Sequence, residues 1–311
     1  MNKTIGILAH VDAGKTTFSE QILYHTKSIR QRGRVDHQDT YLDNHDIERQ
    51  RGITVFAEQG MFSFHNSHYY LIDTPGHIDF SPEMERSIQV MDYAVIIMSA
   101  VEGIEGHTET VWELLKKHQI PTFFFINKID RIGADVSAVI KDIRLNLTED
   151  VYDVTNDLSN SEMTENLAEF IAERNETLFE HYMDKGYDKE LWLRALQDMI
   201  HHNQFFPCMS GSALQDIGVE SFLKRLDLLT TTHYVNEDPF SGRVYKIRHE
   251  SNRTRVTFIK ALSGTLKVRD VVKYGGVEET ISEKVTQIRV YSGNKFRIVD
   301  HVEAGTSVAR L

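Results

Sequence analysis

The sequence contains a single cysteine, Cys208, among 311 residues. It therefore excludes an internal disulfide and a cysteine-based zinc cluster, which suits a reducing compartment. Cys208 stands in the apolar run 205–209, where we expect a buried thiol rather than a reactive one. No apolar run approaches membrane-spanning length, and the first residues lack a signal-peptide pattern. We therefore expect a cytoplasmic protein with no membrane partner.

Positive charge is also scarce, because 46 Asp and Glu outnumber 35 Lys and Arg and leave a net charge of −11. This balance excludes a surface that generally coats nucleic acid or anionic membrane, so a nucleic-acid partner would have to meet a local patch. Internal repeats and low-complexity tracts are absent. With 41% hydrophobic and 26% charged residues, the chain has the composition of a globular protein, and its length predicts two domains.

Strand-like apolar runs and amphipathic helices alternate from residue 1 to about residue 130. Several runs are continuously apolar, as in sheets covered on both faces. The pattern predicts a doubly wound α/β domain with a mostly parallel sheet, whose ligands bind at the carboxyl ends of the strands. The predicted strands cover residues 4–9, 54–64, 68–73, 93–99, 122–127 and 205–209, and the predicted helices cover 17–24, 108–118, 136–147 and 218–229.

A phosphate-binding loop follows the first predicted strand, where residues 9–16 read Ala-His-Val-Asp-Ala-Gly-Lys-Thr. Backbone N–H groups and a helix N-terminus attract a polyphosphate there, while Lys15 reaches the terminal phosphates and Thr16 ligates Mg²⁺. Ala9 replaces the usual first glycine, which a negative φ allows. The loop predicts that a nucleotide's phosphates are bound by Asp12, Ala13, Gly14, Lys15, Thr16 and Thr17.

Residues 30–52 lack apolar periodicity and should form a long loop. A long loop beside a nucleotide site is a candidate switch, and the alternative is a solvated surface excursion without a role. The loop is followed by Ile53 and Thr54, which place a hydroxyl just before the next strand. The hydroxyl of Thr54 favours the interpretation of this loop as a switch.

A second chemical motif, Asp-Thr-Pro-Gly-His at 73–77, follows the strand 68–73. Asp73 can hold Mg²⁺ through a water molecule, and the backbone N–H of Gly76 can meet a terminal phosphate with no side chain in the way. An isolated Asp-x-x-Gly is most often a turn. Because this motif follows a phosphate loop by one pair of predicted strands, it indicates an element that senses the terminal phosphate.

A third motif, Asn-Lys-Ile-Asp at 127–130, ends the strand 122–127. The Asp130 carboxylate can accept hydrogen bonds from N1–H and the exocyclic amine of guanine, and adenine offers neither donor in that geometry. Asn127 would tie this turn to the phosphate loop, and the stem of Lys128 would lie against the base. Further along, Ser212 and Ala213 belong to a small-residue turn whose backbone can touch the guanine carbonyl. The predicted ligand is therefore GTP rather than ATP.

In the remaining chain the spacing of apolar residues changes twice. Residues 149–204 read as a charged helical insert, and alternating strands follow Pro239. Strands predicted over 242–248, 254–262, 270–274, 283–291 and 307–311 indicate a small antiparallel β-barrel. We therefore expect a GTP-binding domain over 1–232, with its insert at about 149–204, and a barrel domain over 239–311.

These motifs, in this order and followed by a barrel, resemble those of the translational GTPases over the whole chain. The resemblance is strongest to the tetracycline resistance ribosomal protection proteins, relatives of elongation factor G. It rests on the phosphate loop, on Asp43-Asn44 followed by Glu-Arg-Gln-Arg-Gly-Ile-Thr at 48–54, and on Phe-Phe-Ile-Asn-Lys-Ile-Asp at 124–130. It implies a GTPase that acts on the ribosome, contacts ribosomal RNA and proteins, and is a monomer off the ribosome.

The resemblance also implies roles for single residues. Thr54 would be the second hydroxyl on Mg²⁺, and His77 would position the attacking water, where many other GTPases carry Gln. Val11 and Ile53 match an apolar pair that screens this histidine until the ribosome engages. Asp12 matches a position implicated in binding a monovalent cation such as K⁺, and the alternative for it is a simple Asx-turn.

Members of the resembled family continue well past the barrel, whereas this sequence stops at Leu311. We therefore expect an N-terminal fragment that binds GTP but cannot release tetracycline from a ribosome. Three alternatives stay open from the residues: a translocation factor of the elongation factor G type, a GTP-dependent binding module without significant hydrolysis, and an ATP-using P-loop kinase. Asp130 disfavours the kinase.

Overall fold

A computed structural model describes residues 1–33, 40–41, 58–74, 81–159, 161–250, 253–275, 280–293 and 295–311. Its centre is a seven-stranded sheet in which every neighbouring pair is parallel except β2 with β3. In spatial order the strands are β2 (Glu58–Phe64), β3 (Ser67–Asp73), β1 (Asn2–Ala9), β4 (Tyr93–Ser99), β5 (Thr122–Asn127), β9 (Phe206–Ser210) and β6 (Val151–Asp153). The predicted α/β fold with a mostly parallel sheet is confirmed.

Helices cover both faces of this sheet because its strands are apolar on both sides. In β4, Val95 and Ile97 join one buried cluster, and Ala94 and Ile96 join the other. The first cluster includes residues of α1 (Lys15–His25), α6 (Glu165–Ala172), α7 (Glu176–Lys185), α8 (Lys189–His201) and α9 (Val219–Leu229), and the second those of α3 (Ser81–Ile88), α4 (Gly106–Lys117) and α5 (Val136–Asn146).

No helix in the described part of the chain is long and apolar enough to span a membrane.

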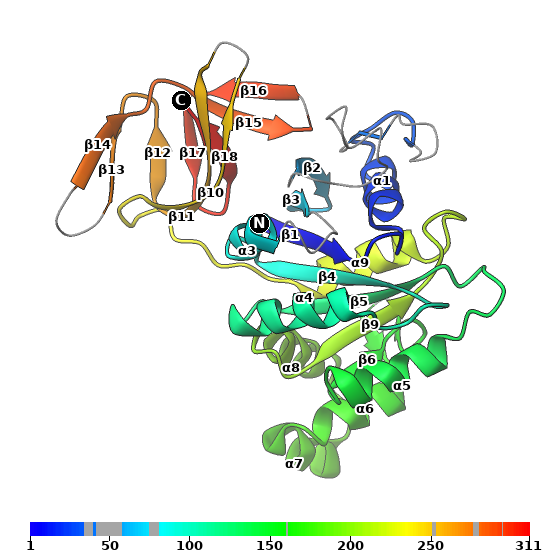
Figure 1. The fold of residues 1–311 in the computed structure, drawn as a ribbon. Coiled ribbons are helices and arrows are strands. Elements are labelled where there is room, and N and C mark those ends of the chain that lie inside the picture. The colour runs from blue at the N-terminus through cyan, green and yellow to red at the C-terminus, as the bar shows by residue number, and fades with distance from the viewer. Residues whose placement is uncertain are drawn as a thin grey trace.

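The insert contains strands as well as the expected helices. Its first strand, β6, pairs with β9 and extends the main sheet. A short hairpin of β7 (Leu158–Ser159) and β8 (Glu162–Met163) follows before α6 begins. In Figure 1, α6 and α7 lie at the end of the molecule opposite to the C-terminal strands. Three residues of β6 are too few to show a periodic pattern, so the sequence does not reveal them.

The C-terminal strands form a second, antiparallel unit, here called the β domain. Its largest sheet has the order β10-β11-β18-β15-β16, and two further pairs are β12-β17 and β13-β14. These strands are β10 (Ser241–His249), β11 (Arg255–Ser263), β12 (Thr265–Lys267), β13 (Val271–Gly275), β14 (Thr280–Lys284), β15 (Ile288–Ser292), β16 (Lys295–Val299), β17 (His301–Glu303) and β18 (Ser307–Arg310). The predicted antiparallel β fold is confirmed.

The strand predicted over 283–291 is wrong as a single element, because the chain breaks between β14 and β15. The N–H of Val285 donates to Asp270 O, and the N–H of Thr286 donates to Leu311 O. The chain therefore leaves its pairing with β13 here and begins to pair with β18. A strand that changes partner bends at a corner, and alternating apolarity continues through such a bend without marking it.

Charged side chains hold the β domain against the edge strand β2 and against the residue that precedes β4. Lys260 Nζ lies 2.7 Å from Asp92 Oδ1, with 2% of the lysine exposed. Lys246 Nζ lies 2.8 Å from Glu58 Oε1, with the side chains 9% and 5% exposed. Tyr234 adds a hydrogen bond to Asp92 from the segment that joins the two units. Because buried charges are stable only when paired, these contacts select one relative position of the two units.

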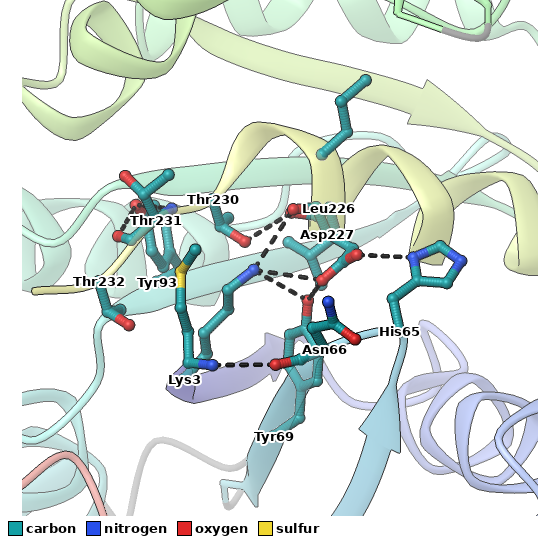
Figure 2. A network of polar contacts seen from close by, with 12 residues as sticks. Lys3, His65, Asn66, Tyr69, Tyr93, Leu226, Asp227, Thr230, Thr231 and Thr232 are labelled. Carbon is teal, nitrogen blue, oxygen red and sulfur yellow. Dashed lines mark hydrogen bonds and ion pairs between the residues drawn. The ribbon is translucent and has the colours of Figure 1, made fainter.

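A buried polar network joins the start of β1 to α9, at the end of β1 away from the phosphate loop (Figure 2). Lys3 Nζ donates to Asp227 Oδ1 and to Tyr69 Oη, at 3.3 Å and 3.2 Å. Tyr69 Oη donates to Asp227 over 2.5 Å, and His65 Nδ1 lies 2.8 Å from the other carboxylate oxygen. Burial lowers the pKa of Lys3 against the attraction of Asp227. Burial opposes ionisation of Asp227, yet these partners bring its pKa below the ordinary value.

We expect Asp227→Asn to lower the free energy of unfolding by about 2 kcal/mol at neutral pH, because the buried Lys3 ammonium loses its charge partner. A carboxylate whose pKa falls on folding stabilises the protein at pH values above its ordinary pKa of 3.8. This contribution is lost as the pH falls through the folded-state pKa. The difference between variant and wild type should therefore shrink in acid. Urea unfolding at several pH values measures it, with the exposed Asp184 of α7 changed to Asn as control. An equal loss at every pH would contradict the ion-pair explanation.

Candidate functional site

Two left-handed residues shape the loop between β1 and α1. Asp12 has φ 64° and Gly14 has φ 96°. A Cβ on Gly14 would lie 2.3 Å from Asn127 Nδ2, so only glycine fits there without displacing that side chain. The N–H of Ala13 donates to His10 O over 3.2 Å and closes the turn. The phosphate loop predicted at 9–16 therefore has the strand, tight turn and helix of an anion cradle.

The first turn of α1 is open to an anion. Gly14 is its N-cap and provides no side-chain hydrogen bond, and the first turn contains no acidic residue. Thr16 and Thr17 lie half-buried in this turn. Because the first N–H groups of a helix lack partners within the helix and carry partial positive charge, this end suits a phosphate.

Lys15 and Asp73 form a buried ion pair at the same strand ends. Lys15 Nζ lies 2.7 Å from Asp73 Oδ1, with the side chains 8% and 0% exposed. The pair forms because β1 and β3 run in parallel with Ile7 opposite Asp73. Thr74 Oγ1 then donates to Ile7 O over 2.9 Å and keeps the end of β3 beside the loop. Two motifs 58 positions apart thus meet at one point.

Asn127 connects the phosphate loop with the turn that follows β9. Its Nδ2 donates to Ala13 O over 2.8 Å, and its Oδ1 accepts from the N–H of Ala213 over 2.8 Å. Gln21 of α1 donates to Ala213 O over 2.7 Å. The sequence interpretation overlooked Gln21, although a polar residue on the buried side of α1 is a signal that could have revealed it.

The turn after β5 contains the other residues that the sequence predicts to bind guanine. Lys128 has φ 65°, and its Nζ lies 3.5 Å from Glu102 Oε2. The N–H of Ile129 donates to Gly211 O over 3.3 Å, which holds this turn against the small-residue turn. Asp130 is exposed, whereas Ser212 is buried. The exposed Asp130 carboxylate is therefore accessible to a ligand.

The sequence of this chain matches two known protein families. Residues 2–232 match the model described as the elongation factor Tu GTP binding domain. The chain belongs to this GTP-binding domain family. Residues 239–310 match a second model, elongation factor G domain 2. The resemblance to translational GTPases indicated by the motifs is therefore confirmed.

The relatives of this GTP-binding protein include tetracycline resistance proteins. TetM from transposon Tn5251 of Streptococcus pneumoniae is 34% identical over 98% of this chain, and TetM of Ureaplasma urealyticum is 35% identical over the same share. TetP of Clostridium perfringens is 33% identical over 97% of the chain. In each case the chain spans 48% of the relative's length. A solved structure from Thermus thermophilus has the same fold, with a TM-score of 0.85, 22% identity, and coverage of 99% of this chain and 52% of that one.

Four predicted residues of the GTP-binding domain lie outside the described part of the chain, namely Ile53, Thr54, Gly76 and His77. Their roles stay predictions. Val11, the other member of the predicted apolar pair, is half-buried in the phosphate loop, and Asp12 beside it is exposed.

A contact absent from the sequence interpretation joins the phosphate loop to α4. His10 Nε2 lies 2.7 Å from Glu105 Oε2, and the rings of His10 and His107 are 6.2 Å apart. Glu105 is the N-cap of α4, yet its side chain makes no capping hydrogen bond. This contact could not be predicted from the sequence, because it depends on β1 and β4 being neighbours.

The oxygen donors of this site suit Mg²⁺. Thr16 supplies a hydroxyl at the helix start, and Asp73 supplies a buried carboxylate that contacts the preceding residue, Lys15. Mg²⁺ typically takes one or two protein oxygens together with phosphate oxygens and water. Among the residues with described positions, no group of three or more His, Cys, Asp or Glu could hold a metal ion alone. The donor set therefore fits a metal that binds together with a nucleotide.

Proposed function

We propose that this chain binds GTP with Mg²⁺ and hydrolyses it to GDP and phosphate, as the GTPase part of a ribosomal protection protein that confers tetracycline resistance. The observation that carries the proposal is the double hydrogen bond of Asn127, which joins the phosphate loop to the guanine-side turn. This link supports a single site in which the loop after β1 binds the phosphates and the turns after β5 and β9 recognise guanine. The resistance proteins among the relatives support this role over that of a translocation factor.

Hydrolysis would follow from positioning and charge stabilisation. A water oxygen bonds to the γ-phosphorus, and a proton of that water passes to a phosphate oxygen. The bond from the phosphorus to the bridging oxygen breaks, and the leaving GDP takes its electron pair and negative charge. Lys15 and the N–H groups of the loop stabilise this charge, and His77 positions the water. Mg²⁺, held by Thr16, Thr54 and, through water, Asp73, would neutralise the phosphate oxygens. K⁺ near Asp12 would add to the same effect.

The charge distribution supports a ribosomal partner for the β domain. Residues 239–311 contain 14 of the 35 Lys and Arg but only 7 of the 46 Asp and Glu, which gives +7 against −18 for the rest of the chain. A local excess of positive charge favours ribosomal RNA, whose phosphates an overall acidic protein would repel. We propose that the protein is cytoplasmic, that it is a monomer off the ribosome and that ribosome binding accelerates its slow intrinsic hydrolysis.

Nucleotide binding and phosphate release test this function. The purified chain should bind fluorescent GTP and GDP, and a hundredfold excess of ATP should not compete. With Mg²⁺ it should release phosphate slowly, and ribosomes should accelerate the release by the complete gene product. A GTP-dependent binding module would bind ribosomes with a non-hydrolysable analogue but show no accelerated release. Effective competition by ATP would contradict the guanine assignment.

A further inference from the structure

Gln21 is a buried amide on the side of α1 that meets the turn after β9. Only 3% of the residue is exposed. Its Nε2 donates to Ala213 O over 2.7 Å, and its Oε1 accepts from Arg32 Nη1 over 3.1 Å. Because burying an amide is costly unless its polar atoms are paired, these two hydrogen bonds fix the orientation of the side chain.

Two hydrogen bonds orient the backbone on both sides of Ala213. Asn127 Oδ1 accepts from the N–H of Ala213, and Gln21 donates to its carbonyl oxygen. A trans peptide is planar, so a bond to Ala213 O also sets the direction of the N–H of Leu214, which points the opposite way. Gln21 therefore orients a backbone donor in the turn that is predicted to meet the guanine carbonyl.

A second contact from α1 holds the other end of this turn. His25 Nε2 lies 2.6 Å from Asp216 Oδ1. Gln21 and His25 are four positions apart and therefore lie on the same face of α1. Ser212 and Ile217 close the turn through two backbone hydrogen bonds, of 2.9 Å and 2.8 Å. The turn is thus a closed loop held at two points against the helix that begins at the phosphate loop.

The packing of α1 against α9 supports this arrangement. The helix α9 follows the turn directly, and in Figure 1 it lies beside α1. The rings of Phe18 and Phe222 meet edge to face, with their centroids 5.3 Å apart. Because Phe18 precedes Gln21 by less than one helical turn, this contact keeps Gln21 within reach of Ala213.

We propose that Gln21 is a positioning residue for guanine specificity, which holds the turn at Ala213 so that a backbone N–H of the turn meets the guanine carbonyl. The inference rests on the proposed function. Gln21 stands six positions after Lys15, which is about 9 Å along the helix axis. One rigid helix would therefore set the distance between the phosphates at its start and the base at this turn. A displaced turn would lose its hydrogen bond to the carbonyl.

Two variants and a matched control test this role on the 311-residue chain. Gln21→Met keeps the length of the side chain and removes both polar atoms, and Gln21→Asn keeps an amide that is one methylene too short. The control Gln197→Met removes a donor to Leu228 O, also over 2.7 Å, that joins α8 to α9. Leu228 follows Asp227, whose network lies at the end of β1 away from the phosphate loop (Figure 2). Thermal unfolding shows that each variant is folded.

Competition titrations with modified bases separate positioning from a general loss of stability. Inosine triphosphate lacks the exocyclic amine that Asp130 is predicted to bind but keeps the carbonyl oxygen. Thioguanosine triphosphate keeps the amine and carries sulfur, a weak acceptor, in place of that oxygen. Both Gln21 variants should weaken GTP, GDP and inosine triphosphate about three- to tenfold, the worth of one hydrogen bond, and leave thioguanosine triphosphate within about twofold. Gln197→Met should leave all four affinities unchanged.

The preference for GTP over thioguanosine triphosphate is the decisive quantity. Equal weakening of all four nucleotides in the Gln21 variants would show that Gln21 only supports the fold, and it would overturn the proposal, as would unchanged GTP affinity. If the wild-type chain binds GTP but has no preference for it over thioguanosine triphosphate, the positioning role fails while guanine binding stands. If the wild-type chain binds neither GTP nor GDP, the proposed function fails instead.

Discussion

Asp130→Asn is expected to weaken GTP binding about a thousandfold and to strengthen binding of xanthosine triphosphate by a similar factor. In the proposed site the carboxylate would accept two hydrogen bonds from guanine, whereas an amide offers one acceptor and one donor. Xanthine replaces the exocyclic amine of guanine with a carbonyl oxygen, which the amide can meet with its N–H. The variant therefore reverses the hydrogen-bond pattern instead of merely weakening it.

Asp130 lies where its substitution should change nucleotide binding without disturbing the fold. Its side chain is exposed, and the turn is held by the backbone bond from Ile129 to Gly211, which the substitution leaves intact. Thermal stability should therefore stay at the wild-type value. Competition titrations with both triphosphates measure the preference, and the exposed Asp142 of α5 changed to Asn is the control. Unchanged GTP affinity in Asp130→Asn would remove the basis for guanine specificity.

His77→Ala in the complete gene product should lower ribosome-stimulated hydrolysis at least a hundredfold and leave GTP affinity near the wild-type value. A residue that positions or deprotonates the attacking water contributes about 10²- to 10⁴-fold to the rate and little to binding of the ground state. The described geometry before it supports this role, since Thr74, three positions before His77, donates a hydrogen bond to Ile7 O near the end of the strand that precedes the phosphate loop.

Single-turnover phosphate release with and without ribosomes separates this role from a loss of binding. The control is His202→Ala, because His202 is exposed at the end of α8, away from the phosphate loop. Equal stimulation of His77→Ala and wild type would show that another group positions the water. A parallel loss of GTP affinity would instead indicate that His77 belongs to the binding surface.

The long elements of the α/β domain could be predicted from local pattern, and the short strands of the β domain could not. Strands β4 and β5 have the predicted bounds, because each is a continuous apolar run between clear breaks. Strands β12 and β17 have three residues each, too few for a period, and the break between β14 and β15 follows a change of pairing partner. Pairing depends on distant residues, which local alternation does not record.

The motifs and their order could be read directly from the sequence, because the phosphate loop, the predicted metal-binding aspartate and the predicted guanine-binding turn each depend on a few neighbouring residues at the end of a strand. Which distant residues meet could be seen only in the folded structure. Gln21 contacts Ala213, His10 contacts Glu105, and Tyr41 contacts Ser292. Each of these contacts requires the packing of separate strands and helices, and packing is set by the whole core rather than by any single stretch of sequence.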